Sequence, residues 1–141
     1  MEEFIRRADL ALYEAKSRGR GEIRLFTHGT TIHGAQPLPP EHRMTPLTYY
    51  YAGGAADAIR ILDALPGSQE IAVLGLGTGT MACYARPERH FDFFEIDPDV
   101  VAIAENPALF TYLSDCGSPY EIILGDARLQ MAKQPASSYD M

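Results

Sequence analysis

The sequence predicts an α/β fold built around a parallel sheet. Three observations lead to this prediction: short apolar runs alternate with helical segments from Glu70 onward, a glycine-rich turn follows the first run, and an acidic residue follows each of the next two. Such alternation is typical of parallel strands that are joined by crossover helices. Because the carboxyl ends of parallel strands lie along one edge, we expect the glycines and the acidic residues to meet there.

The strands predicted for this sheet are short and apolar, which indicates that they are buried. They span residues 71–74, 91–96 and 120–124. A further strand is expected to begin at Ser138–Met141, so the predicted sheet is incomplete at Met141. The helical segments and the one apolar turn between and after these strands span 81–84, 99–105, 108–113 and 127–133.

The residues before this sheet predict a smaller unit and a connecting segment. Helical spacing of apolar residues predicts a helix over Glu3–Arg18, and alternation predicts a half-buried strand over Glu22–Thr27. Residues 28–46 are rich in proline and lack periodicity, which favours a β-hairpin or a long ordered loop. A helix over 55–65 follows and is ended by Pro66-Gly67. We therefore divide the chain into a helix–strand segment (1–27), a hairpin or loop segment (28–52) and a sheet domain (53–141).

Composition indicates a soluble protein whose partner is not nucleic acid. The 141 residues carry a formal net charge of −7, which repels a phosphate backbone. Cys83 and Cys116 lie far apart, without the spacing of a zinc cluster or a disulfide framework. No stretch approaches the roughly 20 apolar residues that a membrane-spanning helix needs. We expect a cytoplasmic protein that binds neither nucleic acid nor a membrane.

The histidines do not predict a metal site. His28 and His33 are five positions apart and have no acidic or thiol partner near them in the sequence. Hydrogen bonding within a loop is the expected role of this pair. His42 and His90 lie among charged residues and are expected to face solvent.

The residues that follow the predicted strands are suited to binding a nucleoside. Gly75, Gly77 and Gly79 let the backbone approach a ligand without obstruction by side chains. Glu95 ends the second strand, 16 positions after Gly79, close to the offset at which an acidic side chain binds ribose hydroxyls. Asp126 follows the third strand, where its carboxylate can accept a hydrogen bond from the exocyclic amine of a base.

Helix capping is the alternative role for the acidic residues. Glu95 or Asp97 could cap the helix that begins near Pro98, and Asp126 could cap the helix at 127–133. We assign capping to Asp97 and ligand binding to Glu95 and Asp126, with the base held over Ile96. The predicted cofactor-binding residues are Gly75, Gly77, Thr78, Gly79, Glu95, Ile96, Asp126 and Ala127.

The pattern Gly75-Leu76-Gly77-Thr78-Gly79 resembles the first motif of S-adenosylmethionine-dependent methyltransferases. This resemblance implies a Rossmann-like parallel sheet of the methyltransferase type. It also implies that Glu95 and Asp126 stand at the ribose and adenine positions. A dinucleotide-binding fingerprint requires GxGxxG, and here the third glycine comes one residue early, which disfavours nicotinamide and flavin dinucleotides.

A finer resemblance covers residues 28–141, which are similar to the spermidine synthase-like (polyamine aminopropyltransferase) family. The block His28–Gln36, the segment Pro46–Tyr51 and Glu95-Ile96-Asp97 carry it. The resemblance implies transfer of an aminopropyl group to a small-molecule amine acceptor. It further implies that Gln36, Tyr49 and Tyr50 line the substrate cleft, whereas a core-covering aromatic cluster is the alternative for the tyrosines.

Two departures from that family bear on activity. Thr78 stands where the synthases carry an aspartate that holds the aminopropyl amine, and a threonine offers no charge to an ammonium group. The catalytic aspartate of the family follows the strand that begins at Tyr139, so no catalytic residue is assigned here and we expect binding without turnover. Both S-adenosylmethionine and its decarboxylated form are kept as cofactors. Methyl transfer and a non-catalytic nucleoside-binding or dimerisation module are the alternative functions, and a homodimer stays open.

The first residues carry a separate resemblance. The run Arg6–Arg20 contains ADxALYxAKxxGR and resembles the final helix of GGDEF diguanylate cyclase domains, and residues 4–26 are similar to the helix and strand at the end of such a domain. The metal-binding and signature loops of that family do not occur in this segment. The resemblance therefore implies a related structural element and no cyclase activity.

Overall fold

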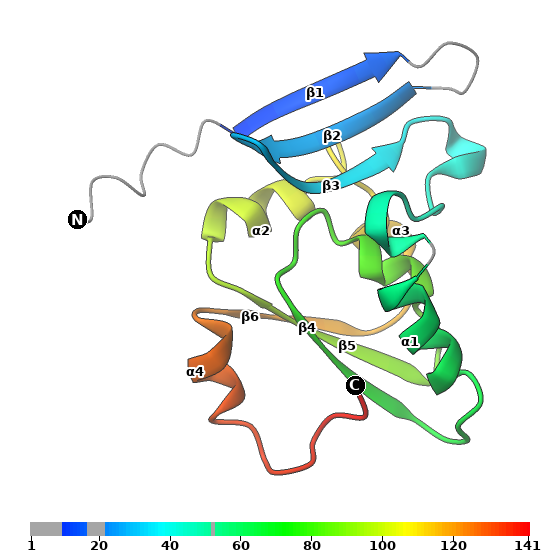
Figure 1. The fold of residues 1–141 in the computed structure, drawn as a ribbon, viewed down its shortest axis with the longest axis vertical. Helices are drawn as coiled ribbons and strands as arrows, with labels where there is room; N and C mark the ends of the chain where they lie inside the picture. Colours follow the sequence, from blue (N-terminus) through cyan, green and yellow to red (C-terminus); the bar gives the residue numbers. More distant parts are fainter. Residues whose placement is uncertain (1–9, 17–21, 52) are drawn as a thin grey trace.

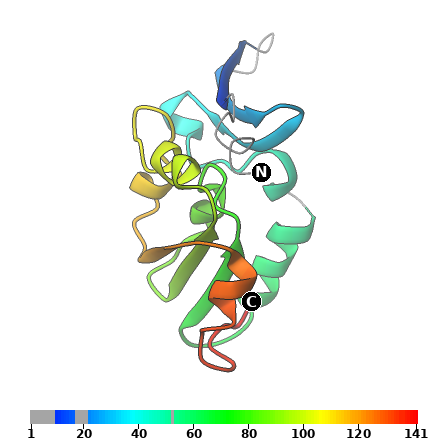
Figure 2. The same ribbon diagram turned by 90° about the vertical axis from the view of Figure 1, so that its left-hand side faces the viewer.

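The computed structural model describes residues 10–16, 22–51 and 53–141, and it has a mixed α/β architecture (Figure 1). One three-stranded sheet is antiparallel and the other is parallel. Figure 2, together with Figure 1, places the antiparallel sheet at one end of the molecule and α4 (Ala127–Met131) toward the other. Within the described residues, no helix combines the length and the apolar character that crossing a bilayer requires.

The parallel sheet confirms the three strands that were predicted from apolar runs. It consists of β4 (Gln69–Leu74), β5 (Arg89–Glu95) and β6 (Tyr120–Leu124), in the spatial order β4-β5-β6. Val73 pairs with Phe93, and Phe93 pairs with Ile122. All three strands run in the same direction, so their carboxyl ends lie along one edge as the sequence predicts.

The helical segments around these strands differ from the predicted ones mainly in length and type. Before β4, α1 spans Gly54–Leu62. Between β4 and β5 the chain forms a 3-10 helix, η3 (Thr80–Tyr84), in place of the predicted helix at 81–84. The remaining helices are α2 (Pro98–Ala104), α3 (Tyr112–Asp115), which begins within the predicted apolar turn, and α4.

One face of the parallel sheet carries the main hydrophobic core. Ile71, Phe91 and Phe93 point to the same face because they are alternate or paired residues, and all three are buried. Ile59 and Leu62 of α1 pack into the same cluster. Full burial of an aromatic or branched side chain contributes on the order of 2 kcal/mol each, so this face dominates the stability of the sheet.

The antiparallel sheet corrects the prediction for the N-terminal segment. Leu10–Lys16 forms strand β1 and pairs with β2 (Glu22–His28), with Leu10 opposite His28 and Lys16 opposite Glu22. The helix expected over Glu3–Arg18 is therefore wrong for residues 10–16, and the rest of it lies outside the described residues. Pairing with β2 extends along the whole length of β1 and satisfies the backbone groups that face β2, and such tertiary pairing overrides local helical spacing.

The segment after β2 forms the predicted hairpin. β3 (Thr31–Pro37) pairs antiparallel with β2, and the short 3-10 helices η1 (Pro40–His42) and η2 (Thr48–Tyr50) follow it. Phe26 of β2 is fully buried and its ring packs against that of Phe110. The Tyr112 hydroxyl donates to the Ala35 carbonyl at 2.9 Å. The hairpin is thus part of the same core as the parallel sheet.

The chain end lies beside the free edge of β4. The Asp140 amide donates to the Glu70 carbonyl and the Ala72 amide donates to the Met141 carbonyl, both at 2.8 Å. These bonds advance in the same direction along both segments and use the edge of β4 that does not face β5. Residues 138–141, where a further strand is expected to begin, therefore run beside β4 but have no regular strand conformation.

A buried arginine joins the amino ends of β4 and β5. Arg89 is 2% exposed, and its guanidinium donates to the Gln69 side chain at 2.9 Å, the Tyr84 carbonyl at 2.8 Å and Asp63 at 2.7 Å. The hydrogen bond from Arg89 is the main reason that the pKa of Asp63 lies below its ordinary value. A carboxylate with a lowered pKa stabilises the fold above its unfolded pKa, and this contribution is lost as the pH falls below about 4.

Arg89→Ala should lower the free energy of unfolding by about 3 kcal/mol, because it leaves buried polar groups without partners. Arg60→Ala is the matched control, since Arg60 and its partner Asp57 are 68% and 59% exposed. That control should change the free energy by less than about 1 kcal/mol. Urea denaturation monitored by circular dichroism measures both. Equal effects of the two substitutions would contradict the assigned role of Arg89.

Candidate functional site

Two adjoining cavities lie at the carboxyl ends of the parallel strands. The first, the strand-end cavity, has a volume of about 330 Å³, and the second, the hairpin cavity, has about 310 Å³. Leu74, Gly75 and Glu95 line both, so the cavities meet at the ends of β4 and β5. The strand-end cavity is completed by Phe94, Ile96, Gly125, Asp126, Ala127 and Arg128, and the hairpin cavity by Thr31, Ile32, His33, Tyr50 and Gly77.

The glycines of the turn after β4 have different neighbours. Gly75 has φ +96°, and a Cβ added to it would meet no atom within 4 Å. A Cβ on Gly77 would lie 2.3 Å from the His33 carbonyl oxygen, and one on Gly79 would lie 2.8 Å from the Leu113 side chain. Gly75 therefore presents bare backbone to the cavities, whereas Gly77 and Gly79 are required by contacts within the protein.

Thr78 has a packing role instead of the predicted contact with a cofactor. Its side chain is fully buried, and its hydroxyl forms a 2.8 Å hydrogen bond with that of Thr80. A Cβ on Gly34 would lie 2.2 Å from Thr78 Oγ1, so β3 lies directly on this residue. Because the hydroxyl is covered by the hairpin, the Thr78 side chain offers no atom to a ligand.

Glu95 is held by backbone amides at the junction of the two cavities. One carboxylate oxygen accepts from Leu76 N at 2.9 Å, and the other accepts from Ile96 N at 2.8 Å and Asp97 N at 3.0 Å. The side chain is 8% exposed. A carboxylate has about four acceptor positions, so roughly one remains for a ligand. Glu95 can thus accept from one ligand hydroxyl without losing a backbone partner.

Asp126 caps α4 and also lines the strand-end cavity, so ligand binding by this residue stays a prediction. Its Oδ1 accepts from Leu129 N at 3.1 Å and caps α4, as in the alternative interpretation. Among the described residues, no hydrogen bond to its Oδ2 occurs, and the residue lines the strand-end cavity. Asp97 caps α2 through a 2.9 Å bond from Asp99 N, which confirms its predicted role.

Apolar side chains surround the acidic groups of the strand-end cavity. Ile96, which lines it, is 66% exposed, and Leu74 at the end of β4 is also 66% exposed. Ala127 and Arg128 at the start of α4 form another part of the wall. The cavity therefore offers an apolar surface for a flat ring, carboxylate acceptors at its edge and one cationic residue, Arg128.

The three residues predicted to line a substrate cleft have different surroundings in the structure. Gln36 is 2% exposed, and its amide bonds to the Arg43 carbonyl and to Thr111, so it joins β3 to the segment before α3. A side chain so buried offers no atom to a substrate, which corrects that prediction. The backbone of Tyr49 lies in η2, and its side chain lies outside the described part of the structure. Tyr50 lines the hairpin cavity, and its contact with a substrate stays a prediction.

His33, for which the sequence predicts hydrogen bonding within a loop, lies instead in strand β3 and lines the hairpin cavity. It lies at an irregularity in the β2–β3 register, where Phe26 pairs with Gly34 and Thr27 pairs with Ile32. Its ring stacks on the Phe26 ring with centroids 4.8 Å apart. Bulges redirect side chains in this way. A bulge has no reliable signal in a single sequence, so only the structure could identify this residue.

A third cavity of about 380 Å³ lies at the opposite, amino end of the parallel strands. Its charged lining residues all have partners, since Arg86 and Arg89 both bind Asp63 and Arg60 binds Asp57 outside the lining. Burial raises the pKa of the Cys83 thiol in its wall to about 12, so this cysteine is not an activated nucleophile. In open α/β sheets ligands bind outside the carboxyl ends of the strands, and we place the candidate site there.

The site brings together backbone, carboxylate and apolar groups that were predicted to bind a nucleoside. Gly75, Glu95, Ile96, Asp126 and Ala127 all line the strand-end cavity. No protein-family model matches the chain, and none of the curated proteins matches it. We therefore infer the family and the activity of this chain from the geometry of the site.

Proposed function

We propose that this chain is a spermidine synthase-like transferase domain that binds S-adenosylmethionine or its decarboxylated form. The observation that carries the proposal is the convergence of five predicted cofactor-binding residues on one cavity: Gly75, Glu95, Ile96, Asp126 and Ala127. Three different strand ends contribute these residues. Their side-chain types fit an adenosyl group, as the following contacts explain.

Each part of an adenosyl group has a counterpart in the strand-end cavity. The remaining acceptor position of Glu95 suits a ribose hydroxyl, and Asp126 Oδ2 suits the exocyclic amine of adenine. Ile96 provides an exposed apolar face for the ring. A volume of about 330 Å³ is in the range of small-molecule sites.

The strand arrangement supports a Rossmann-like sheet. In space, the chain end lies beside β4, on the side away from β5, so the order is chain end, β4, β5, β6. The connection from β6 therefore returns across the sheet to the other side of β4. Doubly wound sheets reverse their strand order in this way, and they bind ligands beside the reversal. The glycine turn follows β4 at that point.

The adjoining hairpin cavity suits the reacting end of the donor and an amine acceptor. Attack by an amine nitrogen on the carbon beside a sulfonium requires alignment of the two molecules and removal of one proton from the amine. No lysine or arginine occurs among the described residues that line this cavity. A methionine carboxylate would lack a cationic partner there, which favours the decarboxylated donor. Because Thr78 is buried, its identity does not discriminate between the two donors.

Calorimetric titration with S-adenosylmethionine, its decarboxylated form and methylthioadenosine tests the proposal. We expect saturable binding of all three, with the decarboxylated donor tighter than the carboxylated one because of the missing cation. Tighter binding of S-adenosylmethionine would favour the methyltransferase alternative. An absence of binding to any of the three would refute the nucleoside site.

Asp126→Asn should weaken nucleoside binding by roughly 3- to 10-fold while leaving stability unchanged. The amide oxygen of asparagine can still cap α4, since asparagine and aspartate are equally good caps, but the acceptor at Oδ2 is replaced by a donor. Asp97→Asn is the matched control, because Asp97 caps α2 and is absent from the lining of both cavities. Calorimetry measures affinity and thermal denaturation measures stability. Unchanged affinity in Asp126→Asn would remove Asp126 from the site.

Gly75→Ala should weaken nucleoside binding by about tenfold or more, because its methyl group would occupy space at the junction of the cavities. Gly67→Ala is the control, since Gly67 has nearly the same backbone angle, φ +97°, and open space around it. Both substitutions should therefore cost about 1 to 2 kcal/mol of stability through backbone strain. The same calorimetric titration compares the two variants. Equal affinities would show that Gly75 does not face the ligand.

A further inference from the structure

A cluster of potential metal ligands lies on the face of the parallel sheet opposite the main core. His90 and Asp92 are alternate residues of β5, so both point to this face, and Glu121 of β6 is the register partner of Asp92. One ligand atom from each residue lies within 4.8 Å of the others. Sequence reasoning missed this cluster because its residues come from two strands and adjoin only when the strands pair.

The sequence predicts that His90 faces solvent, but His90 and its neighbour Asp92 are both partly buried. The His90 side chain is 30% exposed and that of Asp92 is 14% exposed, and His90 Nε2 lies 2.9 Å from Asp92 Oδ1. Glu121 is exposed and so has freedom to move toward them. Two ligand atoms of one zinc ion can lie up to about 4.2 Å apart. The ligand atoms of this cluster lie within 4.8 Å of one another, so movement of the side chains alone can bring them to that separation.

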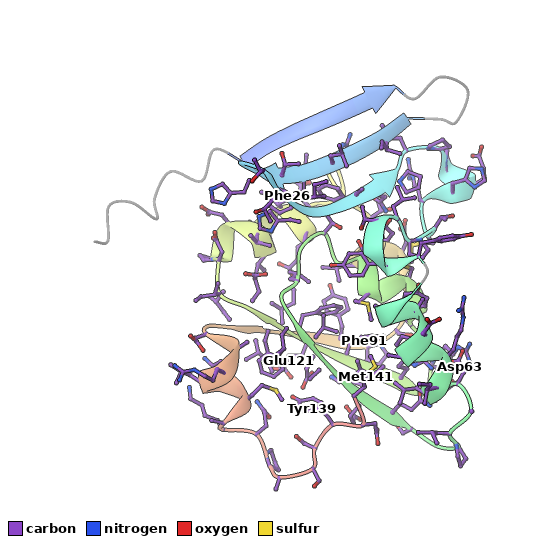
Figure 3. All side chains as sticks on the ribbon, in the orientation of Figure 1. Phe26, Asp63, Phe91, Glu121, Tyr139 and Met141 are labelled. Atoms are coloured by element: carbon purple, nitrogen blue, oxygen red, sulfur yellow. The ribbon has the colours of Figure 1, made fainter. Side chains whose placement is uncertain are left out.

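A phenol hydroxyl outside the cluster fixes the orientation of its central carboxylate. Tyr139 donates to Asp92 Oδ2 at 2.6 Å, which leaves Oδ1 directed at His90. The Tyr139 ring packs edge-on against buried Phe94. Figure 3 shows Glu121 and Tyr139 on the same side of the parallel sheet, toward α4 and the chain end. Ligating carboxylates are commonly oriented by such an outer hydrogen bond.

The two carboxylates on this face favour a cation at this place. Asp92 and Glu121 lie directly opposite each other on neighbouring strands, a pairing of like charges that destabilises a sheet unless a positive group lies between them.

We propose that His90, Asp92 and Glu121 form a binding site for a divalent transition-metal ion such as Zn²⁺. One imidazole and two carboxylates suit Zn²⁺ better than Mg²⁺ or Ca²⁺, which prefer oxygen ligands alone. Three protein ligands leave a coordination position for water. The ion joins β5 to β6, and through Asp92 and Tyr139 it stabilises the chain end beside β4. The site is separate from the strand-end cavity and does not depend on the proposed transferase function.

Zn²⁺ titration by calorimetry after treatment with a chelator tests this site. The wild-type chain should bind one Zn²⁺ saturably, and its thermal midpoint should rise with the Zn²⁺ concentration. His90→Gln, Asp92→Asn and Glu121→Gln should each weaken binding by at least tenfold. Tyr139→Phe should weaken it by about tenfold, because the hydrogen bond that orients Asp92 is lost.

His42→Gln and Glu41→Gln are the matched controls, since both residues are exposed and lie outside the cluster. They should leave Zn²⁺ affinity unchanged. Glu121→Gln changes an exposed side chain and so keeps the test valid if either substitution on β5 impairs folding. Absence of saturable binding, or equal binding by the cluster variants and the controls, would show that His90 and Asp92 form a histidine–carboxylate pair only.

Discussion

The candidate site depends on one interaction, the binding of the Glu95 carboxylate by backbone amides. Leu76 N lies in the glycine turn after β4, whereas Ile96 N and Asp97 N lie in the turn after β5. A single buried side chain therefore fixes the two turns that form the junction of the cavities. Without it, buried amides would lose their acceptor, at a cost of about 1 to 3 kcal/mol each. The open position of Gly75, next to Leu76, follows from this arrangement.

The hairpin determines how the rest of the glycine turn is used. Strand β3 approaches the turn so closely that a side-chain carbon on Gly34 or Gly77 would collide with Thr78 or with the His33 carbonyl. Glycines on both segments thus allow two backbones to pack together. The contact covers Thr78 and, at the same time, makes β3 one wall of the hairpin cavity. Fold and site are consequently linked, because the segment that completes the core also forms part of the cavity.

Local sequence signals predicted the parallel sheet well and the antiparallel sheet only in part. The strand at Tyr120–Leu124 matches its predicted range because turns and an apolar run define it locally. The N-terminal helix failed over residues 10–16 because pairing with β2, which no local pattern reveals, decides the conformation there. Glu95 and Asp126 lie at the predicted cavity, whereas Thr78 and Gln36 do not reach it. Their burial results from docking of the hairpin, which a single sequence does not specify.

The short strands of the parallel sheet carry core residues on one face and charged residues on the other. A parallel sheet usually buries apolar residues on both faces. Here Phe91 and Phe93 face the main core, but their neighbours His90 and Asp92 point to the opposite face of the sheet. Those charged residues alternate with the phenylalanines, so the strand retains its apolar character in the sequence. The polar face then requires its own partners, which Tyr139 supplies in part. The hydrogen bond from Tyr139 to Asp92 therefore both packs the chain end on this face and provides a partner for one of its charges.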